Sequence, residues 1–436
     1  MIVPAPLRLL AGLALAAVVG GVASAAGEPG ADDGVILTPD EIAMAGDFSP
    51  LPPVPPDPTN AVADHSAAAR LGQALFFDTR LSGSGEVSCG SCHEYGLGWG
   101  DGRPLAQGTT DHVRHSMSLW NVAYNRWFFW DGRKDSLWSQ ALDPLEDPRE
   151  HATSRLAVLH VVAGDAQMAA AYEAVFGPLP PLDDDARFPS EGRPVADDPA
   201  HPHAVAWEAM DPADQELANE AYANLGKAIA AYVRKLVSRR APFDVFVEGL
   251  SDRDPAKLAA LSPAAQRGFR LFAGRGQCFV CHDGPNFTDG EFHNNRVPVD
   301  KLDDGGRAVG IQRLKADPFN GASRFADDGG RRARTRLQLA PRGLHYPGEF
   351  KTPTLRNVAR SAPYMHEGQF ATLEDVLAHY SLLADATPLD VDGEAILQPL
   401  ELSPQETADL VAFLESLSDE SLPEDLRGPP EGPLGR

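Results

Sequence analysis

The four cysteines of the chain fall into two pentapeptides with identical spacing, Cys89-Gly90-Ser91-Cys92-His93 and Cys278-Phe279-Val280-Cys281-His282. This pattern is typical of c-type haem attachment, in which the two thiols add to the porphyrin vinyl groups and the adjacent imidazole binds the iron. A redox dithiol or half of a zinc site would not need a histidine directly after both pairs. The sequence therefore predicts two covalent haems, with His93 and His282 as iron ligands.

A short apolar pattern precedes each pentapeptide. Gly72-x-x-Leu75-Phe76 lies before the first pair of cysteines, and Gly268-x-x-Leu271-Phe272 lies before the second. Apolar residues with helical spacing surround each pattern, so we expect one helix before each haem motif. The repetition predicts a mostly α chain with two cytochrome c-like haem domains, residues 61–245 and 246–420, and long irregular loops.

The remaining sequence alternates between helical and loop-forming stretches. A long helix is expected over 214–238, and two short helices separated by Gly164 are expected over 153–177. The segments 178–212 and 285–350 are rich in residues that favour loops, so we expect both to be long and irregular.

The composition limits the classes of partner. The chain has 436 residues, with 38 Lys and Arg against 62 Asp and Glu, which gives a net charge of -24. A nucleic-acid partner is therefore not expected, because phosphate binding needs a basic surface. Hydrophobic residues make up 43% of the sequence, which is enough for a buried core.

The first 25 residues are predicted to be a secretory signal peptide. Arg8 supplies positive charge, Leu9 to Val22 is an apolar run, and Ala23-Ser24-Ala25 fits the cleavage pattern. The run is short for a membrane anchor, so we expect export to the periplasm with no membrane span in the mature chain. A proline-rich linker over 26–60 and a flexible tail over 421–436 are expected to flank the two domains.

Four further motifs accompany the haem pentapeptides. They are Leu75-Phe76-Phe77-Asp78-x-Arg80-Leu81-Ser82-Gly83, Phe129-Trp130-Asp131-Gly132-Arg133, Thr352-Pro353-Thr354-Leu355-Arg356-Asn357-Val358 and Ala362-Pro363-Tyr364-Met365-His366-Glu367-Gly368. With these motifs the sequence resembles the bacterial di-haem cytochrome c peroxidases and their MauG-type relatives, from about Leu71 to Leu417. Each motif alone is a weak signal, whereas together they are specific.

The resemblance implies a division of labour between the two haems. The N-terminal haem, bound by His93, reacts with hydrogen peroxide. The C-terminal haem, bound by His282, is six-coordinate and relays electrons. Trp130 matches the tryptophan that the family places between the haems, although a core aromatic residue is the alternative interpretation.

Two residues are expected in the distal pocket of the N-terminal haem. Gln140 and Glu150 fall where the family has a glutamine and a glutamate. Such a carboxyl group can move a proton between the two oxygens of peroxide during O–O cleavage. A solvated charge in an acidic stretch is the alternative interpretation of Glu150, and Glu146 is the next candidate for the role.

The sixth ligand of the C-terminal iron separates two subtypes of the family. The resemblance implies methionine in the peroxidases and tyrosine in the MauG type, and the matching position here is Tyr380. Tyr380 also falls on the apolar stripe of a helix that begins after Thr372, so we expect it to face inward. Met365 and His379 are the alternative ligands, and a packed core tyrosine is the alternative role.

Two more expectations come from the resemblance. Many relatives block the distal face of the N-terminal haem with a histidine; Gln107 stands at the matching position, although His112 and His115 lie nearby. We therefore expect a five-coordinate N-terminal haem at rest. The family also holds a calcium ion between the domains. Ser361 and Pro363 fit its backbone ligands, but His115 stands where an asparagine ligand would be.

These residues favour a peroxide-dependent oxidoreductase. Its expected partners are hydrogen peroxide and a small cytochrome or copper protein that donates electrons. One alternative is a MauG-type enzyme that oxidises residues of a partner protein, which Tyr380 as a ligand would favour. An alternative from another class is a non-catalytic di-haem electron carrier with a sixth ligand on both irons.

Overall fold

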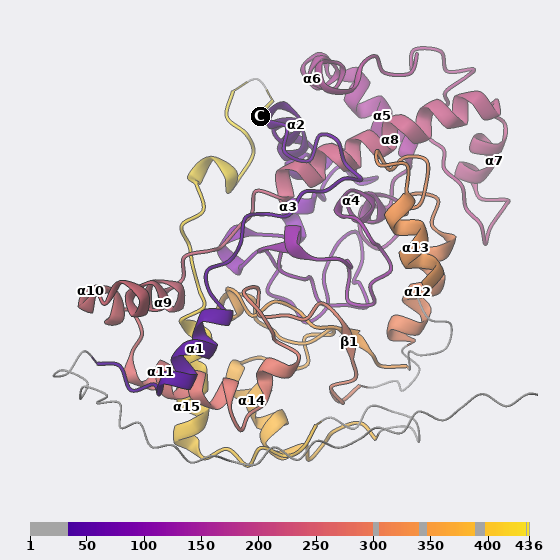
Figure 1. Ribbon diagram of the computed structural model, residues 1–436. Coiled ribbons are helices and arrows are strands. Elements are labelled where there is room, and N and C mark those ends of the chain that lie inside the picture. Colours follow the sequence, from indigo (N-terminus) through magenta and orange to yellow (C-terminus); the bar gives the residue numbers. More distant parts are fainter. Residues whose placement is uncertain (1–33, 300–304, 340–346, 389–396, 433, 436) are drawn as a thin grey trace, which may run out of the picture. The chain divides into compact units, whose positions relative to one another are not determined.

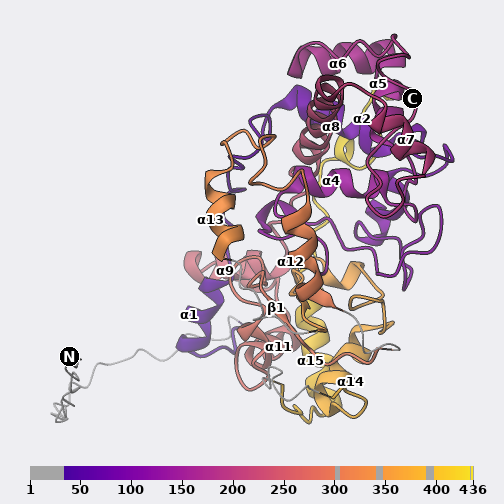
Figure 2. The same ribbon diagram turned by 90° about the vertical axis from the view of Figure 1, so that its right-hand side faces the viewer.

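The computed structural model describes residues 34–299, 305–339, 347–388, 397–432 and 434–435. As the sequence predicts, these residues are mostly helical, with fifteen α-helices and two strands of two residues each (Figures 1 and 2). The predicted signal peptide over 1–25 lies outside the described residues. Within the described part of the chain, no helix is long and apolar enough to cross a membrane.

The helices of the first half precede and follow the first haem motif. They are α1 (Pro39–Asp47), α2 (Ser66–Phe77), α3 (Cys89–Cys92), α4 (Leu137–Glu146), α5 (Arg155–Gly164), α6 (Ala166–Phe176), α7 (Pro202–Glu208) and α8 (Pro212–Val233). The elements of the second half are α9 (Pro242–Asp252), α10 (Pro255–Leu258), α11 (Pro263–Ala273), β1 (Phe292–His293), α12 (Gly306–Ala316), α13 (Arg331–Leu339), β2 (Phe350–Lys351), α14 (Leu373–Leu382) and α15 (Pro404–Glu415). The two strands pair antiparallel.

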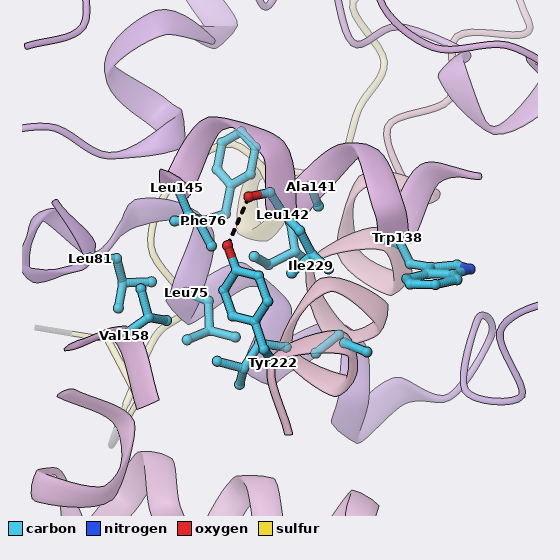
Figure 3. Packing of buried hydrophobic residues seen from close by; sticks show 14 of the residues in the cluster. Leu75, Phe76, Leu81, Trp138, Ala141, Leu142, Leu145, Val158, Tyr222 and Ile229 are labelled. Carbon is cyan, nitrogen blue, oxygen red and sulfur yellow. Dashed lines mark hydrogen bonds between the residues drawn. The ribbon is translucent and has the colours of Figure 1, made fainter. Parts of the chain in front are cut away.

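A helix crossing organises the N-terminal core. α2 packs across α8 at Gly72, where an added Cβ would lie 1.8 Å from the carbonyl oxygen of Ala228. Only glycine lets the two backbones come so close. Buried residues of α2, α4 and α8 form one hydrophobic cluster around this crossing, in which the Tyr222 hydroxyl donates to the Leu142 carbonyl at 2.9 Å (Figure 3).

The C-terminal core repeats this arrangement. α11 crosses α15 at Gly268, where an added Cβ would lie 2.0 Å from the carbonyl oxygen of Asp409. Buried phenylalanine rings surround this crossing. The Gly-x-x-Leu-Phe repeat therefore has a structural cause, since each glycine permits a close helix crossing ahead of a haem motif. The domain boundary after residue 245 stays a prediction, because contacts join Gly34–Arg436 into one compact unit.

A second correspondence links the chain before α4 to the chain before α14. Matching residues of the two segments are separated by the same number of positions in the sequence. Asn121 and Asn357 both have a φ of 60° and precede short 3-10 turns. Further along, Phe129 and Met365 have φ values of 65° and 73°, each next to an isolated antiparallel bridge. The backbone plan that leads into α4 is therefore used again before α14.

Two segments that were expected to be irregular contain helices. α7 lies within 178–212, and α12 and α13 lie within 285–350. The sequence contains little sign of α12 and α13, because the apolar residues of α12 do not gather on one face and those of α13 are few. Tertiary packing stabilises them instead: Leu314 of α12 and Leu337 of α13 are buried in a small cluster with Trp127.

The proline-rich segment and the tail both contact the N-terminal helices. Within the predicted linker 26–60, the Asn60 side chain donates to the Lys227 carbonyl of α8 at 3.0 Å. Within the predicted tail 421–436, the carbonyls of Asp425 and Gly428 accept hydrogen bonds from Gln73 of α2 at 2.6 and 2.7 Å. Part of each segment is therefore docked on the body of the protein.

Candidate active site

Each haem motif forms a short helical turn that orients its histidine. α3 covers the first pair of cysteines, and Nδ1 of His93 lies 2.8 Å from the carbonyl oxygen of Trp99. In the second motif, Nδ1 of His282 lies 3.0 Å from the carbonyl oxygen of Phe287. Such bonds fix the ring and leave Nε2 as the ligand atom. Both imidazoles are therefore oriented as proximal iron ligands need to be.

Sequence reasoning misses the two residues that supply these carbonyl groups. Trp99 and Phe287 are fully buried and have φ values of 63° and 51°. A left-handed backbone at an aromatic residue is uncommon, so neither composition nor periodicity predicts it. The similar distance of the two residues from their haem motifs is the one signal that could have identified them.

The cysteine environments disfavour the dithiol and zinc alternatives. The four thiols are not paired with one another. Burial raises the pKa of Cys89, Cys92 and Cys278 to about 12. Reactive dithiols and zinc ligands act as thiolates, which require the pKa to be lowered instead. The raised pKa values therefore count against a reactive dithiol, and covalent haem attachment at these half-buried cysteines stays a prediction.

A cavity beside α3 brings the predicted peroxidatic residues together. Its lining includes Cys89, Cys92 and His93, together with Gln140 of α4 and Glu150. After α4 the chain turns back, since the amide of Glu150 donates to the Asp147 carbonyl at 3.1 Å. The structure therefore places both distal candidates at the first haem motif, and their catalytic roles stay predictions.

Glu150 has the environment of a proton-transfer group. Burial raises its pKa to about 7, although Arg133 acts in the opposite direction. Nε2 of His112 lies 3.6 Å from Oε1 of Glu150, while Nδ1 of His112 accepts from the Arg114 amide at 3.1 Å. A carboxyl group that titrates near neutral pH can both accept and return a proton.

Two other candidates are engaged elsewhere. Glu146 binds Arg155 through two hydrogen bonds of 2.9 Å, and it is absent from the described lining of the cavity. Gln107 is exposed, and its side chain accepts a hydrogen bond from Arg103. The geometry therefore favours Glu150 over Glu146 as the distal carboxyl.

The histidines near the first cavity have different positions. Neither His112 nor His115 belongs to the described lining, whereas His151 does. Nδ1 of His151 lies 3.0 Å from the Leu81 carbonyl oxygen, and Nε2 lies 4.0 Å from the sulfur of Cys89. The five-coordinate state of the N-terminal haem stays a prediction.

The second haem motif lines a larger cavity of about 560 Å³. Its lining is mainly apolar, which suits a porphyrin. The predicted residues among those that line it are Cys278, Cys281, His282, Trp130, Met365 and Tyr380. Size, polarity and donor atoms therefore fit a haem held by the second motif.

Two of the three candidate sixth ligands reach this cavity. The Asn295 amide nitrogen lies 3.6 Å from the Met365 sulfur and 3.4 Å from the Tyr380 hydroxyl oxygen. The third candidate, His379, has its Nε2 3.0 Å from the Asn295 carbonyl oxygen and does not belong to the cavity's described lining. The choice between Tyr380 and Met365 stays a prediction.

Trp130 lies where segments of both halves meet. Its Nε1 donates to the His115 carbonyl at 2.9 Å, and the amide of His115 donates to the His366 carbonyl at 2.9 Å. The Trp130 carbonyl accepts from the Lys351 amide at 2.8 Å. Hydrogen bonds therefore connect Trp130 to the loop after the first haem motif and to strand β2.

Two side chains at the predicted calcium site form hydrogen bonds within the chain. His115 is buried, and its Nδ1 lies 2.8 Å from the Arg103 carbonyl oxygen. The Ser361 hydroxyl donates to the Val358 carbonyl at 3.2 Å. Calcium prefers carboxylate, carbonyl and water oxygens, for which an imidazole is a poor substitute. His115 is therefore a poor calcium ligand, and calcium binding through the backbone of Ser361 and Pro363 stays a prediction.

A mostly helical chain with two cavities, each lined by a Cys-x-x-Cys-His motif, defines a di-haem c-type oxidoreductase. Residues 66–252 match the family model described as di-haem cytochrome c peroxidase. The chain is 35% identical over 392 residues to cytochrome-c peroxidase IdrP1 of Denitromonas iodatirespirans, covering 86% of this chain and 89% of that protein. The chain therefore belongs to the di-haem cytochrome c peroxidase family.

Further relatives include both subtypes of the family. The chain is 34% identical over 352 residues to methylamine utilization protein MauG of Methylorubrum extorquens, covering 80% of this chain and 78% of that protein. It is 31% identical over 353 residues to cytochrome c551 peroxidase of Pseudomonas aeruginosa, covering 80% of this chain and 78% of that protein. The family and the enzyme class predicted from the sequence are confirmed.

A solved structure confirms the fold. The crystal structure of a MauG-like protein associated with microbial copper homeostasis has a TM-score of 0.59 and 26% identity, and the match covers 87% of this chain and 98% of that chain. The diheme peroxidase BthA of Burkholderia thailandensis has a TM-score of 0.60 at 23% identity, which bears on the fold alone.

Proposed function

We propose that the chain reduces hydrogen peroxide at a haem attached to Cys89 and Cys92. A second haem, attached to Cys278 and Cys281, relays or stores oxidising equivalents. The observation that carries the proposal is the presence of Gln140 and Glu150 with the first haem motif around one cavity. When bound, the haems supply the peroxide-binding iron and the redox chemistry, which amino-acid side chains alone do not provide.

Glu150 is the proton carrier in this proposal. Splitting the O–O bond requires a proton to leave one oxygen of peroxide and reach the other. As a carboxylate Glu150 accepts this proton, and as a carboxylic acid it returns it to the departing oxygen. Its pKa of about 7 means that both forms are present at neutral pH.

Gln140 orients the peroxide. Its amide offers both donors and an acceptor, and it lines the same cavity as Glu150. The amide does not titrate, so its contribution to binding is independent of pH across the range in which Glu150 changes charge. Gln140 therefore holds the peroxide while Glu150 moves its proton.

Trp130 connects the two haem sites electronically. It lines the C-terminal cavity, and its indole N–H donates to the His115 carbonyl in the loop that follows the first haem motif. That bond fixes the plane of the ring. A fixed aromatic ring between two redox sites favours electron transfer over simple packing as its role.

A MauG-type activity, which oxidises residues of a partner protein, is the second candidate. The position of the Tyr380 hydroxyl in the C-terminal cavity favours it. Phenolate is an anionic oxygen ligand that stabilises ferric and higher states of iron over ferrous iron. A chain with that ligand would be better suited to store oxidising equivalents than to accept electrons from a small donor.

A non-catalytic electron carrier is less well supported. A carrier needs a sixth ligand on both irons, for which His151 is the candidate imidazole in the described lining of the first cavity. Gln140 and Glu150 in the same lining are instead the groups that a peroxidase needs. For the peroxidase, we propose a periplasmic location, from the predicted signal peptide, and a small cytochrome or copper protein as electron donor.

Rapid mixing of the purified holoprotein with hydrogen peroxide tests the proposal. Mass spectrometry first counts the covalent haems. We expect two haems, a fast absorbance change of one of them on mixing, and catalytic peroxide consumption with a reduced small cytochrome. A mass equal to that of the chain without haem would contradict the proposal. A protein with two haems whose absorbance does not change with peroxide would favour the electron carrier.

A further inference from the structure

Three lysines in the described part of the chain are buried, and two of them have carboxylate partners. Nζ of Lys134 lies 2.7 Å from Asp317, and Nζ of Lys227 lies 2.6 Å from Asp327. The third, Lys351, is only 3% exposed and forms no ion pair with any described residue. The other two buried lysines therefore have a carboxylate partner, whereas Lys351 has none among the described residues.

Lys351 lies at the end of β2 and lines the C-terminal cavity. Its Nζ donates a single hydrogen bond, of 3.4 Å, to the Thr352 carbonyl. The carboxylate whose charge acts on it is Asp289, and that carboxylate lies 2.8 Å from Nε2 of His293. No anion of the described chain is thus committed to Lys351.

A second buried polar atom on this cavity also lacks a partner. His366 is 4% exposed, and its Nε2 forms no hydrogen bond within the described residues. Its ring stacks on Phe350, the neighbour of Lys351, with 3.9 Å between the ring centroids. The lining of the C-terminal cavity therefore includes two nitrogen atoms whose hydrogen-bonding capacity the described residues do not fill.

Burial makes an unpartnered ammonium group unfavourable. Loss of hydration lowers the pKa of Lys351 to about 8, so the group remains mostly charged at neutral pH. A buried charge is strongly destabilising unless an opposite charge and hydrogen bonds compensate it. A ligand that brings a carboxylate into the cavity would supply both.

We propose that Lys351 is the binding site for a carboxylate of the C-terminal haem. The inference rests on the proposed function, because it needs a haem attached to Cys278 and Cys281. A haem carries two propionates, on the edge opposite the vinyl groups that take the cysteines. The cysteines hold the vinyl edge, so the propionate edge must meet other lining residues, where Lys351 supplies the charge and His366 a second nitrogen.

The other cation on the cavity is less suited to this role. Arg275 also belongs to the described lining, but it already pairs with Glu406 and its side chain is 48% exposed. An exposed, paired guanidinium gains little from a further anion. Lys351 is therefore the cation whose unfavourable burial a propionate would compensate.

The contact would influence both redox chemistry and geometry. A fixed positive charge beside a haem favours the reduced iron, because reduction lowers the positive charge of the centre. The amide of Lys351 also donates to the Trp130 carbonyl at 2.8 Å. Lys351 is therefore a positioning residue that would hold the propionate edge of the haem close to Trp130.

Replacement of Lys351 in the holoprotein tests the inference. Lys351→Met removes the charge, and Lys351→Arg keeps it. Lys235→Met, at an exposed lysine, is the matched control for a lost charge. Midpoint potentials of both haems by spectroelectrochemistry and propionate bending bands by resonance Raman provide readouts that do not depend on turnover.

We expect Lys351→Met to lower the midpoint potential of the C-terminal haem alone and to shift one of its propionate bands. Lys351→Arg and Lys235→Met should preserve both values. Two haems with unchanged potentials and bands in Lys351→Met would overturn the inference while the proposed function stands. A wild-type protein without covalent haem would instead overturn the proposed function. If Lys351→Met does not yield holoprotein, Lys351→Gln gives the same comparison.

Discussion

Tyr380 in α14 corresponds to Pro144 in α4, because the backbone plan of one segment recurs in the other at constant spacing. Pro144 lines the first cavity, and Tyr380 lines the second. The same helix position thus faces a cavity in each half. A residue with a metal-binding oxygen stands in one half, and a proline without a ligand atom stands in the other. This difference matches the expectation that the C-terminal iron is six-coordinate and the N-terminal iron is five-coordinate.

Replacing Tyr380 with Phe tests its role as a ligand. The substitution removes only the phenol oxygen, so we expect the C-terminal haem to lose its sixth ligand and become high-spin, while the N-terminal haem is unchanged. Absorption and electron paramagnetic resonance spectra measure both. Met365→Leu is the matched control and should leave both spectra unaltered. A spectral change in Met365→Leu alone would assign the ligand to Met365.

The pKa of Glu150 predicts a pH dependence. Glu150 accepts the peroxide proton as a carboxylate, and its pKa is raised to about 7. The second-order rate constant for peroxide should therefore rise as the pH increases through about 7, since more of the group is deprotonated. Stopped-flow absorbance across this range measures the profile.

Glu150→Gln should remove that rise and lower the rate constant by roughly 10²–10⁴-fold, the usual contribution of a general acid–base group. Glu86→Gln, at an exposed residue close to the first haem motif in the sequence, is the control and should keep the wild-type profile. A pH dependence that persists in Glu150→Gln would assign the titration to another group.

Trp130→Phe probes the electronic connection. The variant keeps an aromatic ring but loses the N–H that donates to the His115 carbonyl at 2.9 Å. Turnover with a reduced donor should fall by about tenfold or more, equivalent to roughly 1.4 kcal/mol of barrier, while peroxide still alters the N-terminal haem spectrum. Trp127→Phe, at a buried tryptophan that does not belong to the described cavity linings, should retain turnover. Equal losses in both variants would indicate a packing effect.

Motifs made of chemically specific residues were predictable from the sequence. The two Cys-x-x-Cys-His motifs have few other uses, and an apolar stripe identifies helices such as α8, so both followed from local pattern alone. The positions of Gln140 and Glu150 at one cavity could be expected only through the family resemblance, because the turn after α4 is also held by contacts distant in sequence, such as that of the Thr109 amide with the Glu150 carbonyl at 2.8 Å.

Other parts of the site depend on tertiary structure. The left-handed backbone at Trp99 and the lack of an ion pair at Lys351 among the described residues arise from the surroundings of each residue, not from the residue type. α12 and α13 were missed for a related reason, since packing of residues such as Leu314 compensates for their weak helical pattern. Tertiary contacts override local propensity at these positions.

The glycines at the two helix crossings predict a loss of stability that ordinary helix propensity would not. Gly→Ala in a helix usually stabilises by about 1 kcal/mol. At Gly72 and Gly268 the new Cβ would instead lie 1.8 Å and 2.0 Å from a carbonyl oxygen of the partner helix, so the helices must move apart. We expect Gly72→Ala and Gly268→Ala each to lower the free energy of unfolding by about 1–3 kcal/mol.

Gly164→Ala in α5, where an added Cβ meets nothing within 4 Å, is the matched control and should be neutral or stabilising. Denaturant unfolding of the holoproteins, followed by circular dichroism, measures the difference. Equal stabilities of all three variants would show that the crossings tolerate a methyl group.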